Sequence, residues 1–396
     1  MVGKLPTCIT CPYKENVLKI ELDLYLPPLS QVSGCLLPCL VYFHGGGLTV
    51  GEKTSWFPFW IHGLSSYFCR SFVFSSLGED RAIAAGFSFL SANYQLIPPA
   101  TGHRILDDIK DLFSFLENGI DDVLKAHGRD ESIDTGRIAV IGTSAGGLCA
   151  YLAGIHAKPK PRAVLSMYGM GGNFFVSVYS TPHVIIKAYT FLETHHYLAP
   201  KSAPFFRGRE LLDPKTFSEF MFPNSITLSP VFSSPLSYYG SDHSIPGYPS
   251  NPRMLLARLY LQLGNFLDYY TDEHQGSLSE ILRDHLNAEK DMTLLGWSSL
   301  IPLIHHPLFP QLNISSFPPT FFIHGSQDTA VPVEDSCSLH TQLQSNGIVT
   351  TLKVCAGMEH SFDYESDAEQ RWAIVFDEAF AFLEDQLHPD VNIFAR

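Results

Sequence analysis

The chain has 396 residues, of which 45% are hydrophobic and 17% are charged, a composition that excludes an intrinsically disordered protein. Its 26 lysine and arginine residues are outnumbered by 40 aspartate and glutamate residues, so the formal net charge is −14. Because the chain has no lysine- or arginine-rich run, we do not expect a nucleic acid as a main partner. No stretch approaches the ~18 apolar residues of a membrane span, and Met1–Lys19 lacks the apolar core of a secretory signal.

The eight cysteines are sparse in a chain of this length, and several of them lie in apolar surroundings. Cys8 and Cys11 form a C-x-x-C pattern, but without a second pair this is weak evidence for a zinc or redox site. The histidine pairs His195–His196 and His305–His306 also lack the spacing of metal ligands. We therefore expect a reduced, cytoplasmic protein without a metal site.

Strands and helices alternate in the first part of the chain. Apolar and polar side chains alternate over Leu18–Leu26 and stop at Pro27, which predicts a half-buried strand. Cys39–Phe43 is continuously apolar, as in a central strand that is buried on both faces. The same patterns predict strands at 87–94, 137–141 and 162–168, an amphipathic helix near 105–116 and a helix of small residues at 145–157.

The alternation stops between Gly169 and about Phe317, where aromatic residues and prolines are frequent. One clear helix is predicted in this region, from about Pro252 to Tyr270. Because a structureless loop of this length is anomalous in a compact domain, we expect an inserted helical lid at residues 170–316.

After the insertion the alternation resumes, with strands predicted at 320–324 and 349–355 and helices near 333–344 and 368–386. The sequence therefore predicts an α/β fold with a mostly parallel central sheet, helices on both faces and a core made of residues 1–169 and 317–396. Active groups of such sheets lie on the loops at the carboxyl ends of the strands. The motifs that follow predicted strands in this way are His44–Gly47, Gly142–Gly146, Asp328 and His360.

The segment Gly142-Thr143-Ser144-Ala145-Gly146 fits the pattern G-x-S-x-G between a predicted strand and a predicted helix. Such a sharp turn presents the Ser144 hydroxyl above the sheet, and glycines are needed because a Cβ would collide with the adjacent strand and helix. The alternative is a glycine-rich turn that closes an ordinary strand–helix unit, and the context favours it less. Ser144 is the candidate nucleophile.

The segment His44-Gly45-Gly46-Gly47 follows an earlier predicted strand. Consecutive glycines leave backbone N–H groups unshielded, so that these groups can stabilise a developing oxyanion. A phosphate-binding loop is the alternative, but the Lys-Ser/Thr of a P-loop and the spacing of a dinucleotide-binding fingerprint are both missing.

An acid and a histidine should follow the nucleophile in that order. Asp328 lies just past one predicted strand, and His360 lies after the next strand. His360 would take and return the serine proton, and Asp328 would hold the imidazole in the correct tautomer. Glu334 and Asp335 are rival acids, but both fall in a predicted helix, and the rival base His324 ends a strand and is interpreted as structural.

Together these motifs resemble the hormone-sensitive-lipase-like branch of the α/β-hydrolase superfamily, over about residues 36–170 and 318–388. Members of that branch are mostly carboxylesterases, lipases and deacetylases without cofactors. The resemblance therefore implies the α/β-hydrolase fold and no cofactor. It also implies an oxyanion hole made by the N–H groups of Gly46, Gly47 and Ala145.

The chain departs from the pattern of that branch at three points. Ala92–Pro99 stands in the place of the segment D-Y-R-L-A-P-E, and Gln95 and Pro99 replace its arginine and glutamate, so that a supporting ion pair is lost. The acid motif H-G-x-x-D-x-x-V-P is commoner in peptidase-like and general carboxylesterase hydrolases. The insertion is also longer than the usual cap, and both of these last differences bear on the substrate.

We expect a carboxylesterase-type serine hydrolase (EC 3.1.1.-) that cleaves an ester of an apolar or aromatic small molecule through an acyl-enzyme. One alternative is a peptidase or amidase, in which Asp272 and Glu273 would hold a substrate amine. A thioesterase or acyltransferase that acts on a biosynthetic intermediate is another, and a non-catalytic binding protein with the same fold is a third. An edge strand near the end of the sheet could also pair in a homodimer.

Overall fold

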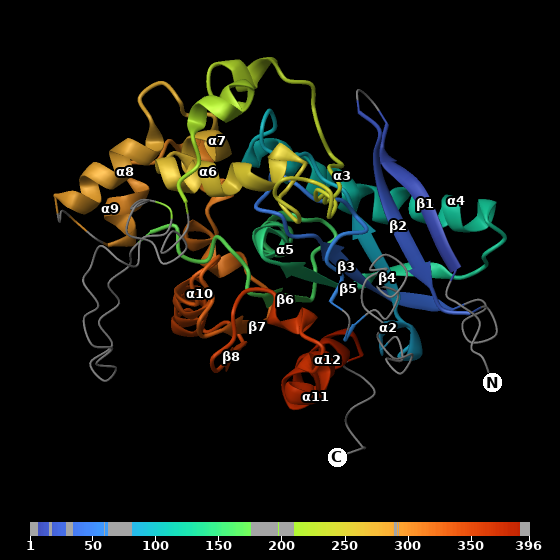
Figure 1. The fold of residues 1–396 in the computed structure, drawn as a ribbon. Coiled ribbons are helices and arrows are strands. Elements are labelled where there is room, and N and C mark those ends of the chain that lie inside the picture. Colours follow the sequence, from blue (N-terminus) through green and yellow to red (C-terminus); the bar gives the residue numbers. More distant parts are fainter. Residues whose placement is uncertain are drawn as a thin grey trace.

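The computed structural model describes residues 7–15, 18–28, 35–58, 60–61, 81–175, 197, 210–288, 291 and 293–388. Its centre is an eight-stranded sheet in the order β1-β2-β4-β3-β5-β6-β7-β8 (Figure 1). β2 runs antiparallel to its neighbours β1 and β4, and every pair from β4 to β8 is parallel. The strands are β1 (Thr7–Lys14), β2 (Ile20–Leu26), β3 (Leu36–Phe43), β4 (Ser88–Ala92), β5 (Ser132–Thr143), β6 (Ala163–Met167), β7 (Thr320–Gly325) and β8 (Thr350–Cys355). The predicted mostly parallel sheet is confirmed.

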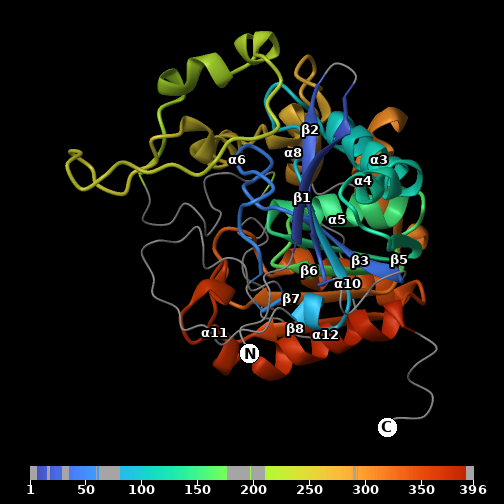
Figure 2. The ribbon, with the colours of Figure 1, turned by 90° about the vertical axis from the view of Figure 1, so that its right-hand side faces the viewer.

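Helices cover both faces of the sheet, because its central strands are apolar on both sides. Val41 and Val140 point to one apolar cluster, and their neighbours Leu40 and Ile141 point to the other, as the two-residue period of a strand requires. In Figure 2 α5 lies above the sheet and α12 below it. The helices around the sheet are α2 (Arg81–Ala84), α3 (Gly102–Asn118), α4 (Ile120–Ala126), α5 (Ala145–His156), α10 (Glu334–Ser345), α11 (Ala368–Arg371) and α12 (Ala373–Leu387).

A helical insertion separates β6 from β7 in the sequence. Its apolar residues, such as Leu259 and Phe266, belong to the same cluster as Ile105 of α3 and Leu148 of α5, so the insertion packs on that side of the sheet (Figure 1). The elements described within it are η3 (Pro214–Phe220), η4 (Asn224–Thr227), η5 (Pro252–Leu255), α6 (Leu256–Leu263), α7 (Phe266–Thr271), α8 (Leu278–Asn287), α9 (Leu294–Ser298), η6 (Leu303–Leu308), η7 (Pro310–Leu312) and η8 (Ile314–Ser316), where η denotes a 3₁₀-helix.

Two of the long helices expected from the sequence are interrupted. The helix predicted from Pro252 to Tyr270 is divided, because Gly264 adopts the left-handed conformation (φ 65°) and ends α6 before α7 begins. The helix predicted over 368–386 is divided at Trp372, whose φ of −114° is not helical. In both cases the apolar periodicity continues across the break, which is why the pattern alone predicts one helix.

The first strand, β1, was not expected from the sequence. It lies at the edge of the sheet, and its Pro12 stands next to a shift in register, a position where a strand tolerates proline. Cys8 and Cys11 are three residues apart on this strand, so their side chains lie on opposite faces, one exposed and the other buried. They cannot hold one metal ion between them.

Within the described ranges, no helix combines the length and the apolar character that crossing a membrane requires.

Candidate active site

Ser144 stands in a sharp turn between β5 and α5. Its backbone has φ 53° and ψ −121°, a region that side chains rarely occupy. A Cβ at Gly142 would lie 2.0 Å from the carbonyl oxygen of Gly146, and a Cβ at Gly146 would lie 2.0 Å from that of Phe43. The two glycines therefore allow the helix to approach the sheet closely enough for the turn to form, as the sequence pattern predicts.

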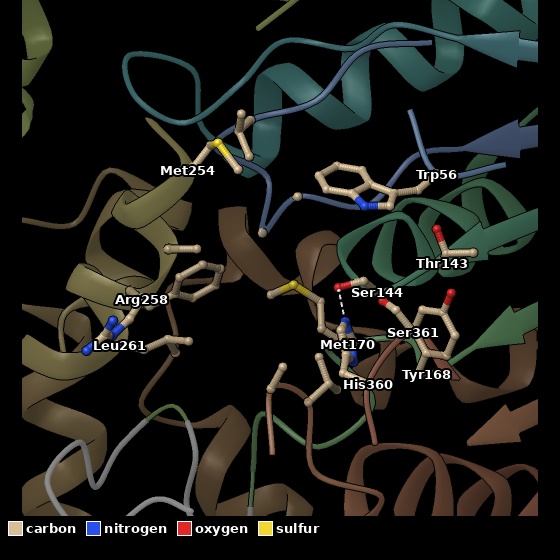
Figure 3. A pocket seen from close by; sticks show the side chains of 18 of the residues that line it. Trp56, Thr143, Ser144, Tyr168, Met170, Met254, Arg258, Leu261, His360 and Ser361 are labelled. Carbon is tan, nitrogen blue, oxygen red and sulfur yellow. Dashed lines mark hydrogen bonds between the residues drawn. The ribbon is translucent and has the colours of Figure 1, made fainter. Parts of the chain in front are cut away.

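The structure brings Ser144, His360 and Asp328 together at the carboxyl edge of the sheet. Figure 3 shows the contact between Ser144 and His360. Ser144 Oγ lies 3.0 Å from His360 Nε2, and His360 Nδ1 lies 2.7 Å from Asp328 Oδ2. Asp328 accepts a hydrogen bond from the Nδ1–H of His360, so His360 Nε2 carries the lone pair that faces the serine hydroxyl. The arrangement can take the proton of the hydroxyl and hold the resulting imidazolium beside a carboxylate.

Asp328 is buried but well supplied with donors. Its Oδ1 accepts hydrogen bonds from the backbone N–H groups of Ala330 (2.9 Å) and Val331 (2.8 Å). Its Oδ2 lies 3.2 Å from His324 Nε2, in addition to the contact with His360. Burial opposes ionisation, but the hydrogen bonds from His324 and His360 outweigh it and hold the pKa of Asp328 below its usual range.

The rival residues occupy other positions. Glu334 and Asp335 begin α10, as expected, and Glu334 is exposed. Asp335 is buried and accepts hydrogen bonds from Gly171 N (2.7 Å) and Tyr197 Oη (3.0 Å), and burial raises its pKa to about 7. His324 is fully buried, with Nδ1 2.7 Å from Ser336 Oγ, so it supports the acid and does not face the serine.

In the glycine loop His44–Gly47, which follows β3, the carbonyl groups are held by hydrogen bonds. Gly45 O accepts the Nδ1–H of His44 (2.8 Å), and burial lowers the pKa of His44 to about 4, so that this ring stays neutral. Gly46 O accepts the N–H of Thr49 (3.0 Å). In a trans peptide the N–H points away from the preceding C=O, so the N–H groups of Gly46 and Gly47 point the opposite way.

Three N–H groups are thus available at the site. Gly46 (φ 102°) and Gly47 (φ 63°) line the same cavity as Ser144, and Gly45 approaches Ser144 so closely that a Cβ there would lie 3.2 Å from the serine Cβ. Ala145 is the first residue of α5, where a backbone N–H has no intrahelical acceptor. None of these N–H groups donates to another described residue.

A cavity of about 240 Å³ opens beside Ser144 and His360 (Figure 3). One wall comes from the core, where Trp56 and Tyr168 lie near the serine. The opposite wall comes from the insertion. Its residues on the cavity are Met170, Tyr197, Leu236, Met254, Ala257, Arg258, Leu261 and Phe266. Most of these side chains are apolar, so the cavity suits an apolar group with its reacting carbonyl at the serine.

Tyr168 and Asp363 belong to the site but were not found from the sequence. The Tyr168 ring meets the His360 ring edge to face at 4.7 Å, and its hydroxyl donates to Asp363 Oδ1 (2.7 Å). Asp363 Oδ2 is buried and accepts no hydrogen bond from a described residue, and burial raises the pKa of this carboxyl to about 6. Tyr168 directly follows β6, so the rule that active groups follow parallel strands could have found it.

The histidine pairs form no metal centre in the part of the chain that is described, where no group of three or more histidine, cysteine, aspartate or glutamate residues could hold an ion. His305 lies 2.8 Å from His103 and 2.9 Å from Glu273, and His306 donates to the carbonyl of Ile301. His195 and His196 lie outside the described residues.

Solved structures share this arrangement of sheet and helices. An α/β-hydrolase superfamily protein from Enterococcus faecalis superposes with a TM-score of 0.51 and 15% identity, covering 96% of this chain and 99% of that one. The esterase LipW from Mycobacterium marinum superposes with a TM-score of 0.50 and 12% identity, covering 97% and 83%. The chain therefore has the α/β-hydrolase fold.

Family profiles and curated relatives match parts or most of this chain. The family described as BD-FAE matches residues 22–164, and the prolyl oligopeptidase family matches residues 268–389. A probable carboxylesterase, M8 from Phoma sp., is 30% identical over 132 residues, which are 33% of this chain and 37% of M8. The non-reducing polyketide synthase ausA from Emericella nidulans is 24% identical over 366 residues, which are 88% of this chain and 12% of the synthase. The chain thus spans well under half the length of these curated relatives.

Proposed function

We propose that this α/β-hydrolase is a serine hydrolase that cleaves the carboxylic ester of an apolar or aromatic small molecule. The observation that carries the proposal is the pair of contacts made by His360, 3.0 Å from the Ser144 hydroxyl and 2.7 Å from the Asp328 carboxylate. The similarity to the probable carboxylesterase M8, 30% identity over 132 residues, supports the same type of reaction.

In the proposed reaction Ser144 Oγ attacks the ester carbonyl while His360 Nε2 takes its proton. The tetrahedral intermediate carries a negative oxygen, which the N–H groups of Gly46, Gly47 and Ala145 stabilise. The intermediate collapses to an acyl-enzyme as His360 returns the proton to the leaving alcohol. A water molecule, deprotonated by His360, then releases the acid and restores Ser144.

The walls of the cavity support an apolar or aromatic substrate. Trp56, Met254 and Leu261 surround the space beside the serine, and a carbonyl group that reaches Ser144 would carry its attached group between them. A peptidase that binds a substrate amine is less well supported, because Asp272 and Glu273 do not line this cavity and Glu273 is paired with His305.

A thioester is the second candidate substrate. The similarity to a non-reducing polyketide synthase extends over 88% of this chain, a larger share than the similarity to carboxylesterase M8 covers. An acyl chain held as a thioester would use the same nucleophile and the same oxyanion site, with a thiolate in place of an alkoxide as the leaving group.

The test compares wild-type protein with Ser144→Ala on p-nitrophenyl butyrate and on butyryl-coenzyme A. The proposal expects turnover that falls by about 10⁴-fold or more in the variant, together with covalent labelling of Ser144 by a fluorophosphonate. The substrate that the wild-type protein turns over faster, p-nitrophenyl butyrate or butyryl-coenzyme A, decides whether an ester or a thioester is the preferred substrate class. Equal rates in wild type and variant, or no labelling of the folded wild type, would instead favour a non-catalytic binding protein.

Residues 170–316 are proposed to act as the lid over this site. We also propose a homodimer in which the outer edge of β8, which pairs with no other described strand, meets its copy. Light scattering coupled to gel filtration measures the molecular mass of the protein in solution and so distinguishes the homodimer from the monomer. A cytoplasmic location remains a prediction from the sequence.

A further inference from the structure

The insertion places a buried arginine behind the glycine loop. Arg253 lies in η5 and is only 7% exposed. Its guanidinium donates to three backbone carbonyls, Thr49 O (2.8 Å), Ile97 O (3.0 Å) and Pro98 O (2.6 Å). Among the described residues it forms no ion pair with a carboxylate, and its Cζ lies 5.8 Å from the centre of the Phe220 ring.

Thr49 connects this arginine to the glycine loop. The Thr49 hydroxyl lies 3.0 Å from the carbonyl of Arg253, so the two residues hold each other through one bond in each direction. The same hydroxyl lies 3.3 Å from Gly46 O, which also accepts the N–H groups of Thr49 (3.0 Å) and Val50 (3.2 Å). Thr49 therefore fixes the direction of the Gly46 carbonyl.

The direction of that carbonyl determines the direction of a donor in the active site. The C=O of Gly46 and the N–H of Gly47 belong to one planar trans peptide and point in opposite directions. A rotation of this peptide that releases the carbonyl from Thr49 would turn the N–H of Gly47 away from the position where an oxyanion forms. Oxyanion stabilisation depends on donors that are oriented before the reaction begins.

Arg253 also holds the segment at 95–99, which follows β4. The Gln95 side chain of this segment donates to Asp108 (2.9 Å). The neighbouring carbonyls of Ile97 and Pro98 are the ones that accept from Arg253, and Ile97 N donates to Leu48 O (2.7 Å). One side chain from the insertion thus joins this segment to the glycine loop.

We propose that Arg253 is a positioning residue for catalysis, which orients the N–H of Gly47 through Thr49 and joins the segment at 95–99 to the glycine loop. The inference rests on the proposed hydrolase function. Burial of a cation without a carboxylate is costly, and a neutral side chain would fill this space at lower cost, so the hydrogen bonds to the three carbonyls account for the arginine. Burial lowers the pKa of Arg253 to about 10, which leaves it charged at neutral pH.

Two substitutions test the connection at different points. Arg253→Lys keeps the charge but loses the planar fork that reaches three carbonyls. Thr49→Val keeps the shape of the side chain and removes the hydroxyl, while Thr49→Ser retains the hydroxyl. With p-nitrophenyl butyrate we expect kcat to fall about 10-fold or more in Arg253→Lys and Thr49→Val, with KM within about twofold of wild type, because a small misplacement of a catalytic donor can cost up to ~100-fold. Thr49→Ser should restore most of the rate.

The inhibition constant of phenylboronic acid is the second measurement, because it responds to the oxyanion site and not to a general loss of structure. Boronic acids form a tetrahedral adduct on a serine, and its oxygen occupies the oxyanion site, so the inhibition constant should rise in parallel with the loss of kcat. Arg129→Lys is the matched control, since Arg129 is also a buried arginine (5% exposed) and donates to a backbone carbonyl, Pro27 O, at a distance of 2.8 Å. We expect it to lower the thermal midpoint and leave kcat unchanged.

The outcomes separate this inference from the proposed function. If Ser144→Ala abolishes turnover and Thr49→Val, folded by circular dichroism, keeps the wild-type kcat and boronate affinity, the role assigned to Arg253 is wrong. The same conclusion follows if Arg129→Lys and Arg253→Lys lose equal fractions of kcat. If Ser144→Ala has no effect, the hydrolase proposal itself fails.

Discussion

Ser144, Asp328 and His360 are carried by turns that follow β5, β7 and β8, whereas Gly46 and Gly47 lie in a loop that rests on the insertion. The first group is positioned by hydrogen-bonded strands within the core. The second depends on packing between the core and a segment some 200 residues further along the chain, as in the 204-residue separation of Thr49 and Arg253. One half of the site is therefore a property of the sheet, and the other half is a property of the insertion.

The half of the site on the sheet and the half at the insertion also differ in the charged groups that are buried beside them. Beside the triad, Asp328 has several donors, while the second carboxylate, Asp363, has Tyr168. Beside the glycine loop the buried charge is the guanidinium of Arg253, whose hydrogen bonds to described residues go to backbone carbonyls. Acidic groups near the histidine favour its protonated form during the reaction, and a cation near the loop fixes peptides without competing for the N–H donors.

The largest expected effect is on the triad. In Asp328→Asn the amide would present N–H groups to His360 Nδ1 and favour the wrong tautomer, so we expect kcat to fall by about 10⁴-fold. Steady-state turnover of p-nitrophenyl butyrate at pH 8 measures this. Glu334→Gln on α10 is the control and should retain full activity, because Glu334 is exposed and begins the helix beyond the site. If Glu334→Gln is the variant that loses activity, the acid has been assigned to the wrong residue.

The same half of the site should respond to pH through Asp363. Burial raises its pKa from 3.8 to about 6, so the folded state holds the proton more tightly than the unfolded state. The proton bound to Asp363 stabilises the folded state. This stabilisation is complete below the unfolded pKa of 3.8 and is lost as the pH rises through the folded pKa of about 6. Asp363→Asn keeps an acceptor for Tyr168 and carries no charge. Its free energy of unfolding relative to wild type should therefore increase by ~2 kcal/mol between pH 4.5 and 7.5.

Urea unfolding at several pH values measures this difference. Asp107→Asn, at an exposed position on α3, provides the comparison for a carboxylate that is not buried. A difference between Asp363→Asn and wild type that stays constant from pH 4.5 to 7.5 would contradict the assignment of a buried, proton-binding carboxyl at this position.

The side chains that lie on the sheet can be predicted from the sequence, whereas the contacts between the glycine loop and the insertion cannot. The sequence predicts the proposed triad because each member stands in a short motif that follows a strand, and parallel strands bring such motifs to one edge. Arg253 gives no comparable signal, because its partners are backbone carbonyls whose positions depend on the packing of the insertion. Gly264 was a usable signal for the end of α6, since an isolated glycine within a helical pattern often marks a C-terminus. The non-helical Trp372 has no such marker.

A smaller effect is expected where the glycine loop meets the insertion. A Cβ at Gly47 would lie 2.3 Å from Ala257 Cβ, and the φ of 63° disfavours any side chain, so Gly47→Ala should shift the loop and lower kcat about tenfold. In the double variant with Ala257→Gly the collision disappears and only the backbone strain remains, so part of the rate should return. If the double variant is no faster than Gly47→Ala, contact with the insertion does not set the position of the loop.

The smallest effect concerns substrate selectivity at the wall of the insertion. Leu261 lines the cavity, whereas Leu259 of the same helix points into the apolar core. Leu261→Ala removes apolar contact with a longer acyl chain, so kcat/KM for p-nitrophenyl hexanoate should fall about three- to tenfold while that for the acetate stays unchanged, since a methylene in a pocket is worth about 1–3 kcal/mol at most. Leu259→Ala should lower the thermal midpoint without changing the hexanoate-to-acetate ratio. Equal ratios in the two variants would mean that α6 does not contact the acyl group, and that selectivity comes from the core side of the cavity.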